Sequence, residues 1–485
     1  QWIRSTAPDQ DFRTQFKRWY GMPLDSAEKK WFRTLKRRPR FRKLVTSRHL
    51  QVISGKREAL FFNSRVGDCL ICGTDLLQLL KFVKKGKTCE KLFKKFEIKD
   101  FEKLLSDLYR AKLIVYENAT ETDTDDFAPD SELVRSGALI RHLRLNVTTH
   151  CNMACTYCYS FSNENDTRVM AWDTAKRAID SFLSLQKEHG HPSASLRFFG
   201  GEPLLNWKVV RETLRYCEVT RGNIDLTYLL NTNGTLLTEA IIRELTGFQT
   251  EIIISLDGTK ENHDRFRRFK TNQGSFKAIN NAIDLCLKHR CKLSIDTTLG
   301  DHNYDQLNAL IDYLVEKQER FGTPVMLGMQ NMTMGFQEKY DTGSLNKKVE
   351  KLVSAIRYAN DKHLNTGGIA LFPYRRIFSG AQTGKFCNAA GRELSVNPDG
   401  TISPCGTLKT EIGTVDDVDM IYQNNSYLNL ARRGIGTIPE CEECEIAVFC
   451  AGGCIADAAA DDDIFKPTRN CAFEKMFFKA MVKAF

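Results

Sequence analysis

The chain has 485 residues, more than one ordinary hydrophobic core organises, so about two to four domains are expected. Its composition, 42% hydrophobic and 27% charged, is that of a globular protein. No apolar run approaches the roughly 20 residues that cross a bilayer, and the first ten residues, QWIRSTAPDQ, lack the hydrophobic stretch of a secretion signal. A cytoplasmic protein with no membrane partner is therefore expected.

The positive charge is concentrated in one segment. The formal net charge is +10, and residues 1–48 hold 14 Lys and Arg against 4 Asp and Glu. The run LKRRPRFRK, at 35–43, could hold nucleic acid or an acidic peptide, or it could be a solvated segment with no partner. We define residues 1–44 as a basic N-terminal segment and assign it no role.

Residues 45–116 predict a small module of strands and helices. Runs rich in apolar and β-branched residues predict strands, and amphipathic stretches with apolar side chains at i, i+3 and i+4 predict helices. The predicted strands are 44–53, 59–64 and 68–73, and the predicted helices are 74–85, 89–96 and 98–113. Three strands and three helices resemble a winged-helix module, which binds DNA in many proteins and peptides in others. The following residues, 117–140, begin with an acidic, apolar-poor stretch and predict a linker.

From residue 141 to 380, short β-rich runs alternate with amphipathic helical patterns. Six consecutive β-then-α units favour a parallel sheet with right-handed crossovers, either an open sheet or a partial barrel. In both architectures the functional site lies in the loops after the carboxyl ends of the strands. The predicted strands are 143–148, 195–200, 226–231, 251–256, 292–298 and 325–330.

Three cysteines lie directly after the first of these strands: Cys151, Cys155 and Cys158. Thiolates this close can hold one polynuclear centre, and three of them suit a [4Fe-4S] cluster whose fourth iron has no protein ligand. Zinc is the alternative, but structural zinc has four closed ligands, and only His150 is near enough in the sequence to supply the fourth.

The spacing C-x3-C-x2-C after the first strand resembles that of the radical S-adenosylmethionine (SAM) enzymes. The resemblance implies that the free iron chelates the methionine end of SAM and that one electron cleaves the cofactor to methionine and a 5′-deoxyadenosyl radical. It also implies that Tyr157 lies beside the adenine.

Further SAM-binding residues are expected at the ends of the next strands. Glycines allow close backbone approach, and a carboxylate can accept hydrogen bonds from the methionine ammonium group. An ordinary strand-to-helix turn and common Asn-Gly and Asp-Gly turns are the alternatives. The residues that the resemblance implies are Gly200, Gly201, Glu202 and Pro203 of a GGEP segment, followed by Asn231, Ser255, Asp257 and Arg267.

Cysteines return in residues 381–485, and their order and spacing resemble the SPASM extension of radical SAM enzymes, which carries two auxiliary [4Fe-4S] clusters. The resemblance implies three clusters in the chain. Seven thiolates cannot close two four-iron sites, so one iron is open or bound by another group. A zinc ribbon over residues 441–454 is the alternative. The implied ligands are Cys387, Cys405 and Cys454 for the first auxiliary cluster, and Cys441, Cys444, Cys450 and Cys471 for the second.

The predicted fold class is α/β: a partial (β/α)6 TIM-like barrel with an N-terminal winged-helix-like module and a C-terminal cysteine-rich iron-sulfur domain. Auxiliary clusters suit the removal of a second electron after hydrogen abstraction, so the resemblance implies net oxidation of a peptide. The N-terminal module resembles the leader-recognition element of ribosomal-peptide maturases. This implies a precursor peptide as substrate, a thioether or carbon-carbon crosslink as product, and an electron donor of the flavodoxin or ferredoxin type.

Two other functions stay open. Sulfatase maturases, which form formylglycine, generally lack such an N-terminal element and usually place an Asp directly after the second SPASM cysteine, where this chain has Gly406. An RNA-modifying enzyme would bind phosphates through its basic segment, although nucleic acid is not the expected partner. No general base or other catalytic residue can be assigned from the sequence.

Overall fold

The computed structural model describes residues 43–54, 58–64, 69–73, 75–88, 91–92, 95, 101–117, 131–158, 166–331, 342–379, 384–408, 410–459 and 463–484. Most of the basic N-terminal segment, most of the acidic linker and most of the predicted helix 89–96 lie outside these ranges. In the described ranges, every helix is too short or too polar to span a bilayer.

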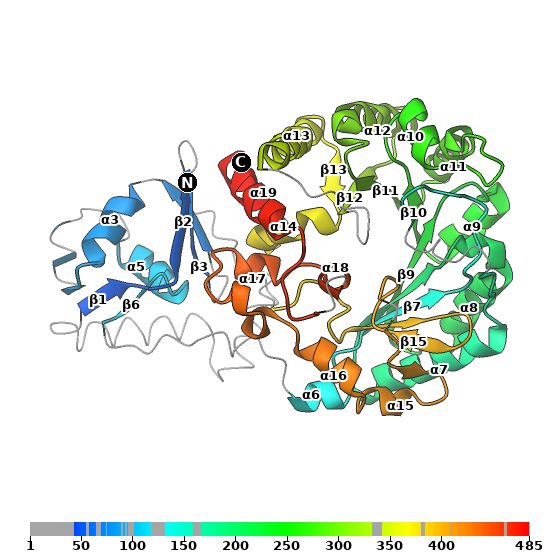
Figure 1. Ribbon diagram of the computed structural model, residues 1–485, viewed down its shortest axis with the longest axis horizontal. Helices are drawn as coiled ribbons and strands as arrows, with labels where there is room; N and C mark the ends of the chain where they lie inside the picture. Colours follow the sequence, from blue (N-terminus) through cyan, green and yellow to red (C-terminus); the bar gives the residue numbers. More distant parts are fainter. Residues whose placement is uncertain are drawn as a thin grey trace.

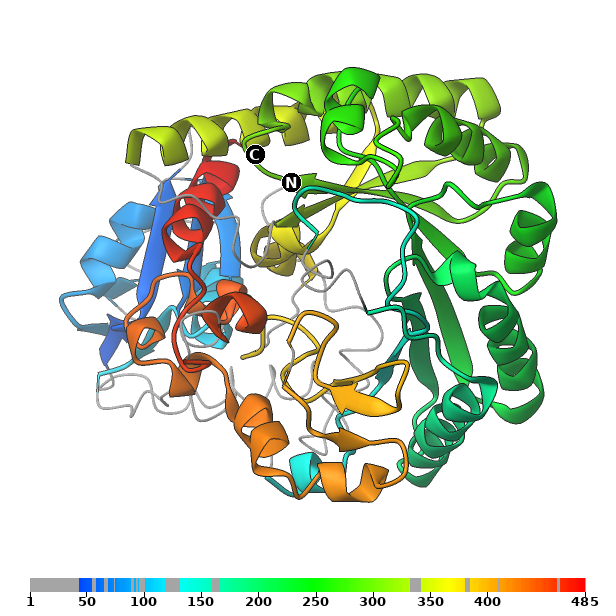
Figure 2. The same ribbon diagram turned by 45° about the vertical axis from the view of Figure 1, so that its right-hand side comes forward.

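A parallel sheet curved into a partial barrel forms the larger part of the molecule, and helices cover its outer face (Figure 1, Figure 2). The prediction of six strands in this region is confirmed, with ends displaced by at most two residues. A seventh parallel strand, β13, was not predicted because it has only three residues, NTG, none of them apolar. In chain order the strands are β7 (His142–Asn146), β8 (Ser193–Phe199), β9 (Asp225–Thr232), β10 (Glu251–Ser255), β11 (Leu293–Leu299), β12 (Val325–Asn331) and β13 (Asn365–Gly367).

The helices around the barrel bury one apolar face each. In α7, the buried residues Ala175, Ala178, Ile179 and Phe182 recur at helical spacing and face the sheet core. α12 ends at Gly322, whose φ of 60° is the left-handed conformation that suits glycine at a helix end. The barrel helices are α7 (Trp172–Glu188), α8 (Trp207–Thr220), α9 (Glu239–Gly247), α10 (Lys260–Phe266), α11 (Phe276–Lys288), α12 (Leu307–Phe321), α13 (Thr342–Asp361) and α14 (Phe372–Ser379).

The C-terminal cysteine-rich region continues the barrel sheet. β14 (Glu393–Val396) pairs parallel to β7, and β15 (Thr401–Ser403) and β16 (Gly413–Thr414) extend the sheet antiparallel. Its buried residues Leu394, Ile402 and Phe477 belong to the same hydrophobic core as the barrel strands. Short helices complete the region: α15 (Val418–Ile421), α16 (Asn425–Arg432), α17 (Ala447–Cys450), α18 (Ile455–Ala459) and α19 (Cys471–Ala484).

The N-terminal module contains two three-stranded sheets, and the prediction of a single strand over 44–53 is wrong. That segment forms β1 (Lys43–Thr46) and β2 (Leu50–Ser54), separated by a turn in which Leu50 N–H donates to the carbonyl of Ser47 at 3.2 Å. Ser47 Oγ also accepts from the amide of His49 at 3.0 Å, a local turn-forming bond that hydrophobic periodicity does not reveal. The other elements are β3 (Glu58–Asn63), β4 (Cys69–Gly73), α3 (Leu76–Val83), β5 (Lys87–Thr88), α5 (Phe101–Arg110) and β6 (Ile114–Tyr116); the short helix α6 (Ser131–Arg135) lies within the predicted linker.

The strand β3 is buried on both faces. Ala59 and Phe61 pack into the module's own core with α3 and α5. Leu60 and Phe62 point the other way and pack with residues of the C-terminal region, where the rings of Phe62 and Phe449 lie 5.2 Å apart. Because adjacent residues of a strand face opposite sides, β3 joins the module to the cysteine-rich region.

Candidate iron-sulfur and cofactor site

The loop that carries Cys151, Cys155 and Cys158 is held in place by backbone hydrogen bonds to a distant segment. Ala154 N–H donates to the carbonyl of Arg268 at 2.8 Å, and Thr156 N–H donates to that of Phe266 at 3.0 Å. Burial raises the pKa of the Cys151 thiol to about 12 and that of the Cys155 thiol to about 11. Thiolates at these positions therefore need a positive partner, which an iron-sulfur cluster supplies.

The zinc alternative at this loop fits the donor set poorly. A structural zinc ion needs four ligands, and the loop supplies three cysteines. His150, the one histidine next to the loop in the sequence, is exposed. The donor set at Cys151, Cys155 and Cys158 is therefore better suited to a polynuclear cluster, which spreads its ligands over several corners.

The glycines of the GGEP segment bring it into contact with the start of the cysteine loop. A side chain at Gly200 would collide with the backbone of Thr148, and one at Gly201 with the backbone of His150. Because neither position carries a side chain, the backbones come close enough for Gly201 N–H to donate to the carbonyl of Thr148 at 2.8 Å. The two glycines thus allow two strand ends to lie against each other, and Pro203 opens the short 3-10 helix Pro203–Asn206 that follows.

Glu202 is fully buried beside the cysteine loop. Its carboxylate accepts from the amide of Leu204 at 3.0 Å, from Thr232 Oγ1 at 2.7 Å and from the amide of Asn233 at 2.7 Å. Burial outweighs these bonds and raises the pKa of Glu202 to about 7. The carboxylate is therefore held in place and caps the 3-10 helix that follows. Its remaining lone pairs are those available to a SAM ammonium group.

Tyr157, Asp257 and Arg267, far apart in the sequence, come together in one cluster. Arg267 Nε donates to Asp257 Oδ2 at 2.8 Å, and Tyr157 Oη donates to the same oxygen. Burial opposes the charge of Asp257, but Arg267 and the hydrogen bonds outweigh it and hold its pKa well below the usual range. The amide of Thr298 donates to Oδ1 at 3.0 Å. Asp257 and Arg267 thus neutralise each other as a buried ion pair.

The remaining two predicted residues, Asn231 and Ser255, lie on the inner face of the barrel near the strand ends. Asn231 Oδ1 accepts a hydrogen bond of 2.7 Å from Arg197. Ser255 lies opposite Asp296 in the register between β10 and β11. Asn231 therefore belongs to a polar network across the barrel strands.

Sequence reasoning missed His302 and His263. The His302 ring stacks on Tyr157 at 5.4 Å and lies 4.5 Å from the Phe266 ring. His263 is fully buried, accepts from the amide of Asp257 at 3.2 Å through Nδ1, and faces Ser275 Oγ through Nε2 at 3.0 Å. The position of His302 just after a predicted strand was a usable signal. Nothing in the sequence marked His263 as a support for Asp257.

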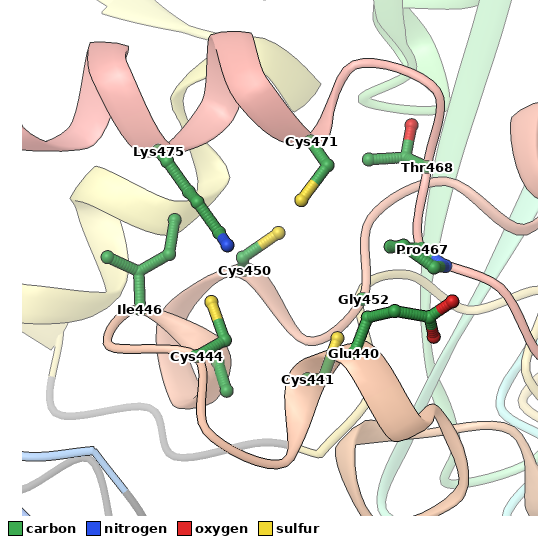
Figure 3. Close-up of a pocket in the computed structure, with 11 residues that line it drawn as sticks. Glu440, Cys441, Cys444, Ile446, Cys450, Gly452, Pro467, Thr468, Cys471 and Lys475 are labelled. Atoms are coloured by element: carbon green, nitrogen blue, oxygen red, sulfur yellow. The ribbon is translucent and has the colours of Figure 1, made fainter.

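Four of the C-terminal cysteines surround one pocket. Figure 3 shows the sulfur atoms of Cys441, Cys444, Cys450 and Cys471 directed into it, together with the ammonium group of Lys475. Lys475 lies one helical turn after Cys471 on α19, so both side chains share a face. Burial opposes the charge of Lys475, but the Cys444 and Cys471 thiolates outweigh burial and raise its pKa. Four thiols around a common space fit a four-iron cluster.

The other three C-terminal cysteines form a second group. Burial, together with mutual repulsion between the thiolates of Cys387, Cys454 and Cys405, raises the pKa of Cys387 to about 12. Cys405 Sγ accepts from the amides of Thr407 and Leu408 at 3.4 and 3.3 Å. Amide-to-sulfur bonds of this kind stabilise a ligating thiolate, so this donor set also fits a cluster with three protein ligands.

Arg433 is buried between the two groups. It donates to the carbonyls of Gly452 at 3.0 Å and Gly453 at 3.2 Å, in the turn that connects Cys450 to Cys454. This turn has three successive residues with positive φ, of which Ala451 (52°) is not a glycine. A single buried cation thus fixes the backbone that carries one ligand of each C-terminal group.

A partial barrel with a three-cysteine loop at a strand end, followed by cysteine-rich groups, defines a class of iron-sulfur protein. Residues 145–314 match the model of the radical SAM superfamily, and the chain contains a radical SAM domain, which binds SAM and a [4Fe-4S] cluster. The prediction of this family and of its α/β partial barrel is confirmed.

Several relatives match most of the chain. It is 22% identical over 437 residues to the radical SAM cyclopropyl synthase TigE of Paramaledivibacter caminithermalis, covering 85% of this chain and 90% of TigE. It is 23% identical over 350 residues to the cysteine-type anaerobic sulfatase-maturating enzyme of Clostridium perfringens strain 13, covering 68% and 92%. Among solved structures, Streptococcus suis SuiB bound to its precursor peptide SuiA superposes with a TM-score of 0.53 at 15% identity, covering 88% and 99%. This last likeness shows a shared fold.

Proposed function

We propose that this chain is a peptide maturase of the radical SAM class with two auxiliary clusters, which abstracts hydrogen from a ribosomally made precursor peptide and closes an oxidative crosslink. The observation that carries the proposal is the N-terminal module, whose sheet is packed onto the cysteine-rich region by β3. A nearby module with an edge strand gives a peptide a place to bind while its reactive part enters the barrel.

The strand β4 lies at one edge of the sheet formed by β2, β3 and β4, and this edge is the place we assign to a leader peptide. Within the described part of the chain, β4 pairs with β3 and with no second strand. An extended peptide can add a strand to such an edge, because its backbone satisfies the unpaired N–H and C=O groups. SuiB, which shares this fold over 88% of the chain, was solved bound to a precursor peptide, and this likeness supports a precursor peptide as the partner here.

The inner face of the barrel supports binding of a polar substrate. Along β7 and β8, Leu145 and Leu196 are buried in the core beneath the helices, so Arg144 and Arg197, which are register partners, face inward. Asp296 on β11 also lies on the inner face, where burial raises its pKa to about 6. Closed TIM barrels fill this space with branched apolar side chains. Charged side chains cannot form such a core, so the space suits a polar peptide.

The three groups of cysteines have different roles in this proposal. SAM with its cluster supplies the radical that removes hydrogen from the substrate. Two further clusters would be held by the remaining cysteines: one by Cys387, Cys405 and Cys454, the other by Cys441, Cys444, Cys450 and Cys471. They would supply an acceptor for the second electron, which closing a bond from the substrate radical requires. The likeness to a cyclopropyl synthase favours a carbon-carbon bond over a thioether, because closing such a ring joins two carbons.

Formylglycine formation is the weaker alternative. At Gly406, where sulfatase maturases usually carry an Asp, the space for a side chain is taken by the Arg144 guanidinium group. Arg144 in turn forms an ion pair with Glu393 at 3.1 Å. A carboxylate at position 406 would therefore have to displace Arg144 from this pair, so this site has no room for that proton acceptor.

The test is anaerobic co-expression of the full chain with short peptides encoded beside its gene, followed by intact-mass and fragmentation analysis. We expect the loss of two hydrogen atoms for each bond formed, abolished in a Cys155→Ala enzyme. Thiol alkylation separates a thioether from a carbon-carbon bond. An unmodified peptide alongside active SAM cleavage, with conversion of a sulfatase-type Cys peptide to formylglycine, would overturn the proposal.

A further inference from the structure

A basic pocket of about 410 Å³ lies along the cysteine loop. We define it by its lining residues, Ala154 and Thr156 from the loop and Arg265, Phe266, Arg268, Phe269, Lys270 and Asn272 from the segment that follows α10. Ala154 and Thr156 are exposed and flank Cys155 on both sides. The pocket is therefore the place where the loop of the radical SAM cluster reaches the surface.

Backbone hydrogen bonds fix the basic segment along this loop. Besides the bonds from Ala154 and Thr156, Lys270 N–H donates to the carbonyl of Asn152 at 3.2 Å, and Met153 forms an isolated antiparallel bridge with Phe269. The segment and the loop therefore form a short two-stranded ladder. The wall of the pocket keeps a fixed position relative to Cys155.

The side chains of the segment are divided between two sides. Arg267 is buried against Asp257. Its neighbours Arg265 and Arg268, with Lys270, line the pocket, and no described residue that lines it carries a carboxylate. Arg265 and Lys270 are exposed, and Phe266 and Phe269 add half-buried aromatic surface. Cations around an aromatic centre are typical of a surface that binds an acidic protein.

We propose that the basic pocket is the docking surface for an acidic one-electron carrier protein of the flavodoxin or ferredoxin class. One electron passes from the reduced carrier to the cluster at Cys151, Cys155 and Cys158; the carrier is oxidised by one electron, the cluster is reduced by one, and no atom is transferred. The cations steer the carrier to the exposed side of Cys155, which shortens the path to the cluster. This role is independent of which peptide the enzyme modifies.

The test compares charge-reversed variants with a purified acidic bacterial flavodoxin as donor and SAM cleavage as readout. In Arg265→Glu/Lys270→Glu enzyme we expect the KM for flavodoxin hydroquinone to rise at least tenfold and its dependence on salt to weaken. Cleavage driven by dithionite and the iron content should match wild type. A matched control reverses two exposed arginines on outer helices, Arg215 and Arg243, whose side chains are 63% and 67% exposed; its KM should not change.

A direct binding measurement gives a readout apart from activity. The Kd of oxidised flavodoxin for the reconstituted holoenzyme should weaken at least tenfold in the pocket variant and stay constant in the control. If the charge-reversed enzyme loses iron, the same measurement is made on Arg265→Gln/Lys270→Gln. A Kd between those of wild type and the charge-reversed enzyme supports the docking surface, and a wild-type Kd overturns it. Unchanged flavodoxin binding together with lost binding of a single-stranded DNA oligonucleotide would overturn the proposal in favour of a nucleic-acid site.

Discussion

The Arg144 guanidinium group fills the space that a side chain at Gly406 would occupy. The two residues are 262 positions apart and meet because β14, shortly before Gly406, pairs with β7. Arg144 is also held by Glu393 and lies 4.9 Å from the centre of the Phe199 ring. The inner face of the barrel and the first C-terminal cysteine group therefore share one charged contact.

Gly406→Asp should lower the free energy of unfolding by about 1–3 kcal/mol, because the new side chain displaces Arg144 from Glu393. Adding Arg144→Ala removes the steric conflict, so the double variant should regain at least half of the loss. Anaerobic thermal unfolding of wild type, the two single variants and the double variant measures these changes in the free energy of unfolding. Additive effects of the two substitutions would show that residues 144 and 406 do not compete for space.

Asp257→Asn should be more damaging than the loss of a surface ion pair. It leaves the charge of Arg267 buried and unpaired, which costs about 3–5 kcal/mol locally. We expect a loss of SAM affinity of at least tenfold, measured by equilibrium binding to reconstituted enzyme. The matched control, Glu239→Gln, breaks the exposed pair with Arg243 and should change SAM affinity less than twofold.

His263 makes the Asp257 site sensitive to acid. Burial lowers the pKa of His263 to about 4, below the ordinary value of 6.5, so the folded protein prefers the neutral ring. The unfolded chain binds an extra proton between these two pH values. The contribution of His263 to the free energy of unfolding is therefore fully present above pH 6.5, and it is lost as the pH drops toward 4, by up to about 3 kcal/mol.

The substitution His263→Gln isolates this contribution, because glutamine does not titrate. Thermal unfolding at several pH values between 7 and 4.5 should show a shallower acid loss in the variant than in wild type. Parallel pH profiles of the two proteins would contradict the assignment to His263.

Lys475 should tune the proposed cluster at Cys441, Cys444, Cys450 and Cys471. A nearby positive charge stabilises the reduced, more negative cluster, so Lys475→Met should lower the midpoint potential by on the order of 50 mV, or about 1 kcal/mol for one electron. Lys479, one turn further along α19 and paired with Glu445 at 2.5 Å, supplies the control. Potentiometric titration followed by electron paramagnetic resonance should show a shift for Lys475→Met and none for Lys479→Met, at equal iron content.

Phe62 should couple the N-terminal module to the rest of the enzyme. It packs edge-on against Phe449, which directly precedes Cys450, and lies 6.3 Å from the Phe478 ring. Phe62→Ala removes these contacts at a cost of about 3–5 kcal/mol. We expect more hydrogen-deuterium exchange in β3 and α17, and weaker crosslinking of full-length precursor, while uncoupled SAM cleavage persists. If α17 exchanges equally in Phe62→Ala and wild type, the packing of the N-terminal module on the cysteine-rich region does not depend on this contact.

The periodicity of the chain was enough to place the barrel strands. Long strands such as β9 and β11 bury apolar residues at alternate positions between turn signals, which makes their position a local property. The turn that splits β1 from β2 was missed, because its residues Ser47, Arg48 and His49 include no glycine or proline to mark it, and the bonds that Ser47 accepts from His49 and Leu50 appear only in the structure. Short polar strands such as β13 carry too few residues for any period.

The sequence by itself determined the radical SAM motif, since the ligands of such a centre lie within one loop and their spacing is its signature. It also determined the order of strands and helices that places this loop at the carboxyl ends of the parallel strands. Only the tertiary structure decided that Asp257 and Arg267 neutralise each other, that Arg144 fills the space at Gly406 and that β3 packs on the cysteine-rich region. These relationships depend on strand register and on which face each side chain takes, and both are fixed only when distant segments pack together.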